Sequence, residues 1–154
     1  MAEVKRIADQ LKRAYEGQAW HGPSLKELLA GVTAEQAAAR PVAEAHSIWE
    51  ITLHISAWES AAIERLKGRY VEEPDEGDWP AVEDASESAW QGALAKVESK
   101  HMTLRDAIAN LDDDKLKTPL AEGKQSAYYL LHGVIQHTLY HAGQIALLKR
   151  AGSF

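Results

Sequence analysis

The chain has 154 residues, of which 23 are acidic, 17 are basic and none is cysteine. This length is typical of a single domain covering residues 1–154, and the net charge of −6 argues against binding to the phosphates of nucleic acid. The absence of cysteine excludes disulfides, thiolate metal ligands and a catalytic thiol within the chain.

The first part of the chain has the apolar periodicity of helices. The spacing of its apolar residues predicts an amphipathic helix over residues 2–18. Ser24 and Thr33 each begin a capping box, in which a cap side chain and a Glu or Gln three positions later bond free backbone N–H groups. These patterns predict two short helices, ended by Pro41.

A second long helix is predicted over residues 47–67, where Ser47 and Glu50 form another capping box. Residues 69–84 are acidic and contain glycine and two prolines, so we expect a loop there. Trp79 in this loop is a candidate lid over a pocket.

Two further long helices complete the pattern. Apolar residues at helical spacing predict one over residues 84–111 and another over residues 126–150, the latter capped by Ser126. A helical turn at Asp114–Leu116 lies between them. Because no segment alternates apolar and polar residues at period two, we expect no strand. The sequence therefore predicts an all-α four-helix bundle.

The last helix carries two histidines at positions where a helix buries apolar residues. His137 and His141 are four residues apart, which places them about 6 Å apart along the helix and about 40° apart around it. A buried polar ring is costly unless its nitrogens are satisfied, and one metal ion satisfies both rings. His54 lies at the edge of the buried face of the 47–67 helix and is the candidate third ligand. The alternative is a set of hydrogen-bonded core histidines.

Other polar residues compete for a place at this site. His101 occupies the inward stripe of the third long helix and could be a fourth ligand, a partner of a ligand, or a satisfied core histidine, which we prefer. Glu50 could ligate a metal or orient an imidazole, although the capping box already gives it a structural role. Gln144 lies one turn after the histidine pair and could hydrogen-bond to it, whereas His132 is turned about 140° away.

The segments HSIWEITLHISAWE (46–59) and QHTLYHAGQIALLKR (136–150) resemble the two signature segments of the DinB/YfiT-like metalloenzyme family. The resemblance covers essentially the whole chain and implies an up–down–down–up four-helix bundle that binds a divalent metal ion, most often nickel or zinc. Carried over residue by residue, the metal ligands are His54, His137 and His141. Many family members have arginine where this chain has Ala142, so any contact made by that arginine is absent or supplied elsewhere.

The resemblance also implies a class of reaction. Characterised relatives include transferases and isomerases that use a low-molecular-weight thiol, so we predict a metal-dependent S-transferase in which such a thiol attacks a small electrophile. The alternatives are a metal-dependent hydrolase and a non-catalytic, metal-stabilised module that binds a small ligand or partner in a stress response. A di-iron carboxylate site is disfavoured because the last helix offers histidines without glutamates. No acid–base residue is identifiable from the pattern.

The expected partners follow from the same observations. No segment has the length of apolar sequence that spans a bilayer, and the N-terminal residues lack the apolar run of a signal peptide. We therefore expect a cytoplasmic protein that binds a small-molecule substrate and neither membrane nor nucleic acid. Family members often pair, so we also expect a homodimer, with Trp79, Tyr128 and Tyr129 as exposed aromatic contacts.

Overall fold

The computed structural model describes residues 2–120 and 125–154. Within these residues the chain forms helices and no strand beyond one isolated bridge between Pro119 and Ser126, which confirms the all-α prediction. The helices are α1 (Glu3–Glu16), α2 (Leu25–Leu29), α3 (Ala34–Ala38), α4 (Ile48–Leu66), α5 (Glu87–Ala109), α6 (Asp113–Leu116) and α7 (Ala127–Ala151). None of the described helices combines the length and hydropathy needed to cross a membrane.

The helix starts follow the capping residues in the sequence. All three predicted capping boxes are present with both of their hydrogen bonds, and they begin α2, α3 and α4. The predicted start of the next long helix at residue 84 is three residues too early. Ser86 caps α5 by accepting a hydrogen bond from the backbone N–H of Ala89, so the helix begins at Glu87. Gly68 follows the last turn of α4 with a left-handed φ of +87°, as expected for a C-terminal cap.

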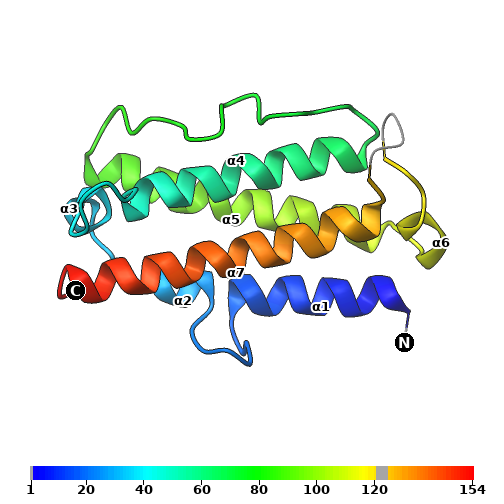
Figure 1. Cartoon of the computed structure of the whole chain (residues 1–154), viewed down its shortest axis with the longest axis horizontal. Coiled ribbons are helices and arrows are strands. Elements are labelled where there is room, and N and C mark those ends of the chain that lie inside the picture. Colours follow the sequence, from blue (N-terminus) through cyan, green and yellow to red (C-terminus); the bar gives the residue numbers. More distant parts are fainter. Residues whose placement is uncertain (1, 121–124) are drawn as a thin grey trace.

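The four long helices lie side by side, with α1 and α7 running in one direction and α4 and α5 in the other (Figure 1). Helix α4 packs against α5 and α7, and α1 packs against the same two helices, so the four surround a common core. The short helices α2 and α3 cover one end of this core (Figure 1), where α2 packs against α1 and α7, and α3 packs against α4 and α5.

The connection between α4 and α5 is long because the two helices run in the same direction. The 19 residues of α4 span about 28 Å at the usual rise per residue, and the chain must return over that length before α5 begins. Figure 1 shows residues 67–86 running back along α4. The side chain of Arg65 fastens the start of this connection by donating to the backbone oxygens of Val71 and Glu72.

The buried core consists of two apolar clusters with polar side chains at their boundary. One cluster contains Trp49 and Trp90 and the other contains Leu104 and Leu131. We call the buried polar residues at this boundary the polar layer; they are His54, Ser56 and Glu59 on α4, His101 on α5, and Thr138 and His141 on α7. Buried polar groups are costly without partners, so the polar layer is where a functional site is expected.

Candidate metal centre

The three histidines that the sequence singled out lie together in the structure. His54 comes from α4, and His137 and His141 come from adjacent turns of α7. The Nε2 atom of His137 lies 2.8 Å from Nε2 of His54 and 3.1 Å from Nε2 of His141. All three ligand nitrogens lie within 4.8 Å of one another, close enough to share one ion.

Two of the rings are held so that a lone pair faces this centre. Nδ1 of His54 donates to the backbone oxygen of Asp78 at 2.5 Å, and Nδ1 of His141 donates to Oε1 of Gln144 at 2.6 Å. A carbonyl oxygen only accepts hydrogen bonds, so both rings carry their hydrogen on Nδ1 and leave Nε2 unprotonated. Metal-binding histidines are commonly oriented by a bond of this kind. Gln144 thus makes the contact that the sequence suggested.

The surroundings keep all three imidazoles neutral. Burial lowers the pKa of His54 and of His141, and the hydrogen bonds to Asp78 and Gln144 only partly offset it. Burial, reinforced by the neighbouring His141 and His54, lowers the pKa of His137 to about 3. Neutral imidazole is the form that binds a metal ion, so the site needs no further deprotonation at neutral pH.

The donor set fits a divalent ion better than it fits hydrogen bonding. The Nε2 atom of His137 carries at most one hydrogen, which can satisfy only one of the two nitrogens that face it. Around a tetrahedral zinc ion, neighbouring imidazole nitrogens lie about 3.3 Å apart. The separations of 2.8 and 3.1 Å differ from this value by only a few tenths of an ångström.

Trp79 from the 67–86 connection covers His54. The two rings stack with centroids 3.9 Å apart and planes 9° apart, and His46 stacks on Trp79 at 3.6 Å and 5°. Two parallel rings this close to one indole can only lie on its opposite faces. Trp79 is therefore half-buried, so the expectation that its side chain is exposed is wrong. The preceding residue holds it in place, since Oδ1 of Asp78 accepts a hydrogen bond from Nε1 of Trp58 at 2.7 Å.

A cavity of about 480 Å³ lies against the three histidines, between α4 and α7. Its wall is mainly apolar and includes Trp58, Ala62, Leu130 and Val134. The exposed side chains of Tyr129 and Tyr140 also line it, so the cavity reaches the surface. This size and lining are typical of a site for a small molecule.

The competing candidates lie elsewhere. Glu50 completes the capping box of α4 and pairs with Arg40 at 2.5 Å. His132 packs its ring against Tyr128 and is not part of the cavity lining. His101 is fully buried as expected, but the preferred interpretation as a satisfied core histidine is wrong, because neither ring nitrogen has a hydrogen-bond partner among the described residues.

The sequence reasoning missed two residues of the site, Asp78 and Glu59. Glu59 lines the cavity, is 1% exposed, and has no hydrogen-bond partner for either carboxylate oxygen in the described part of the chain. A signal for it was present, because Glu59 lies four residues after Ile55 and three before Ala62, both on the inward stripe of the helix. Asp78 had no such signal, since its role depends on the path of a loop.

The amino-acid sequence was compared with known protein families, curated proteins and solved structures. The profile described as the DinB superfamily matches residues 19–145, a range that contains all three histidines of the centre. Comparisons with curated proteins and with solved structures gave no significant match. The chain belongs to the DinB superfamily.

Proposed function

We propose that His54, His137 and His141 bind one divalent metal ion, nickel or zinc, through their Nε2 atoms, and that the protein is a thiol-dependent transferase. The observation that carries this proposal is the convergence of three neutral imidazoles on the wall of a cavity that reaches the surface. Three protein ligands leave coordination positions open, as is typical of catalytic rather than structural metal sites.

The residues of the chain supply binding and orientation. When bound, the metal ion would lower the pKa of a coordinated thiol and so provide a nucleophile near neutral pH. Because the chain has no cysteine, that thiol is an external, low-molecular-weight co-substrate. The apolar wall holds the body of a small electrophile, Asp78 and Gln144 orient two ligand rings, and Trp79 shields His54 from water.

We also propose that residues 1–154 form a single domain with the up–down–down–up order of helices. The directions of α1, α4, α5 and α7 in Figure 1 support this order. A homodimer is proposed as well, with the exposed Tyr128 and Tyr129 of α7 as part of the contact. Sedimentation equilibrium tests the dimer, and a monomer at high protein concentration argues against it.

The proposed function is tested by metal content and conjugation together. Untagged wild type and His137→Ala are purified without chelator, analysed for metal, loaded with Ni²⁺ or Zn²⁺, and assayed with glutathione and 1-chloro-2,4-dinitrobenzene or 4-phenyl-3-buten-2-one. We expect one ion per chain and metal-dependent conjugation in wild type, and loss of both in His137→Ala. His21→Ala, which changes an exposed turn residue, is the control and should keep both.

Each alternative has its own outcome. Retention of the ion by His137→Ala at wild-type stoichiometry rejects the proposed site. Metal binding without conjugation favours a non-catalytic module, and metal-dependent cleavage of p-nitrophenyl acetate without thiol favours a hydrolase.

A further inference from the structure

The polar layer contains two buried titratable residues that the metal centre does not use. Glu59 on α4 is 1% exposed and His101 on α5 is 0% exposed. Nδ1 of His101 lies 3.6 Å from Oε1 of Glu59, just beyond hydrogen-bond distance. Among the described residues, neither carboxylate oxygen of Glu59 and neither ring nitrogen of His101 has a hydrogen-bond partner. A buried charge without a partner is costly, and His101 is the charge-compensating group that the structure places beside the carboxylate of Glu59.

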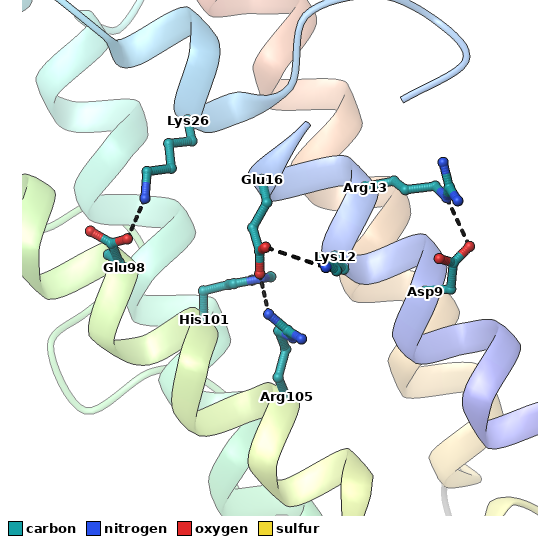
Figure 2. A network of polar contacts seen from close by, with 8 residues as sticks. All are labelled: Asp9, Lys12, Arg13, Glu16, Lys26, Glu98, His101 and Arg105. Atoms are coloured by element: carbon teal, nitrogen blue, oxygen red, sulfur yellow. Dashed lines mark hydrogen bonds and ion pairs between the residues drawn. The ribbon is translucent and has the colours of Figure 1, made fainter. Parts of the chain in front are cut away.

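The two residues connect the cavity with the opposite side of the bundle. Glu59 lines the cavity together with His54 and His137. On the far side of His101, Nε2 lies 3.7 Å from Oε1 of Glu16 on α1. Figure 2 shows His101 reaching from α5 toward this carboxylate. Glu16 is partly exposed, with 29% of its side chain accessible, so the chain of groups ends at solvent.

Several titratable and charged side chains surround Glu59 and His101. On the His101 side, the neighbouring titratable groups are Glu16 and Tyr15 from α1, and Arg105 from α5 pairs with Glu16. On the cavity side, Glu59 shares the lining with His137 from α7. Arg105 and Lys12 both contact the carboxylate of Glu16 (Figure 2). Tyr15 stacks on His101 with centroids 4.1 Å apart, and burial raises the pKa of this phenol, so Tyr15 stays neutral.

We propose that Glu59 is the acid–base residue of the cavity, and that His101, itself anchored by Glu16, is a positioning residue that sets the proton affinity of Glu59. This proposal rests on the proposed function, since it requires a reaction in the cavity. Burial raises the pKa of Glu59 and His101 opposes this effect, a combination that suits a carboxyl group which gives a proton to a substrate and takes one back.

The proposed step applies to addition of a thiol to an α,β-unsaturated carbonyl compound. The thiolate sulfur forms a bond to the β-carbon, and the electron pair of the C=C bond moves to the α-carbon. The α-carbon then takes the proton from the carboxyl group of Glu59, which becomes a carboxylate beside His101. After the product leaves, Glu59 regains a proton from water in the cavity, which balances the proton that the thiol released on ionising.

Two electrophiles separate proton donation from the rest of the reaction. Addition of glutathione to 4-phenyl-3-buten-2-one needs a proton at carbon, whereas substitution on 1-chloro-2,4-dinitrobenzene releases chloride and needs none. In metal-loaded Glu59→Gln we expect kcat for the addition to fall by roughly 100-fold or more, with the substitution affected at least about ten-fold less. Metal stoichiometry should match wild type, because the three candidate ligands are histidines and all three remain in this variant. The circular dichroism spectrum should match wild type as well.

The positioning role of His101 is tested by the pH profile. His101→Gln removes the group that lowers the pKa of Glu59, so the basic limb of kcat/KM for the addition should move to higher pH. Glu16→Gln, at the partly exposed end of the chain of groups, should move the limb less and serves as a second variant if His101→Gln fails to fold. Glu98→Gln is the matched control, since Glu98 lies on the same helix as His101 but pairs with Lys26 at the surface (Figure 2).

The protonation of Glu59 can also be measured directly, without relying on enzyme activity. Carboxyl ¹³C NMR, assigned with Glu59→Gln, should show Glu59 protonated at pH 7 in wild type and losing its proton at still higher pH in His101→Gln. A Glu59 carboxyl that titrates near the ordinary value of about 4.3 overturns the proposal, as does an unchanged ratio of addition to substitution in Glu59→Gln. If wild type binds no metal and conjugates neither electrophile, the proposed function fails, and the NMR titration alone then decides whether His101 controls the proton of Glu59.

Discussion

Acid should destabilise the metal-free protein through its histidine centre. The pKa of His137 is about 3 in the folded chain and about 6.5 in an unfolded chain. Between these values the unfolded chain binds one more proton than the folded chain, so the free energy of unfolding falls by up to about 1.4 kcal/mol per pH unit as the pH decreases. The stability that neutral His137 contributes is complete above about pH 6.5 and is lost progressively down to about pH 3.

The expected loss is large enough to measure. From pH 7.5 to pH 5, His137 alone accounts for up to about 2 kcal/mol, against a total of roughly 5–15 kcal/mol for a typical domain. Partial exposure of the ring makes this value an upper bound. The pKa values of His54 and His141 are lowered by burial as well, so both add to the loss in the same direction.

The assay is urea unfolding of chelator-treated protein, followed by circular dichroism at several pH values between 7.5 and 5. The slope of unfolding free energy against pH should be smaller in His137→Gln than in wild type. In His21→Gln, which alters an exposed turn, the slope should match wild type. Parallel plots for wild type and His137→Gln would refute the reasoning, because they would show that His137 takes up no extra proton on unfolding.

Three other perturbations give defined results. Saturation with Ni²⁺ or Zn²⁺ at 100 times Kd should raise the free energy of unfolding of wild type by about 2.7 kcal/mol, and the same urea assay should show no increase in His137→Ala. Trp79→Ala removes the ring stacked on His54 and should weaken metal binding by about 10- to 100-fold in competition with a chelating dye; unchanged affinity would show that the stack does not support the ligand. Trp90→Phe removes the hydrogen bond from Nε1 to the backbone oxygen of Val32, leaving that buried carbonyl unpaired, and should cost about 1–3 kcal/mol. An unchanged urea midpoint for Trp90→Phe would contradict this account.

The amino-acid sequence alone was enough to predict features that depend on residues within one helical turn, such as the starts of helices and the histidine pair of the last helix. Ser24, Thr33 and Ser47 begin helices because each cap side chain accepts a hydrogen bond from the backbone N–H three positions later, and the Glu or Gln there accepts one from the backbone N–H of the cap, wherever the helix later packs. The approach of His137 and His141 likewise follows from helical spacing, since residues four apart share a face. The place of His54 beside them followed from its position on the inward edge of its own helix together with the family resemblance.

Contacts between distant segments could not be read in this way. The carbonyl that orients His54 belongs to Asp78, 24 residues away, on a connection whose path is set by the parallel packing of α4 and α5. Helical spacing places Glu59 on the buried face of α4, but only the packing of α5 brings His101 to within 3.6 Å of it. Local patterns therefore predict which side chains point into the core. They do not predict which two buried side chains contact each other, because each such contact depends on how whole helices are positioned in the bundle.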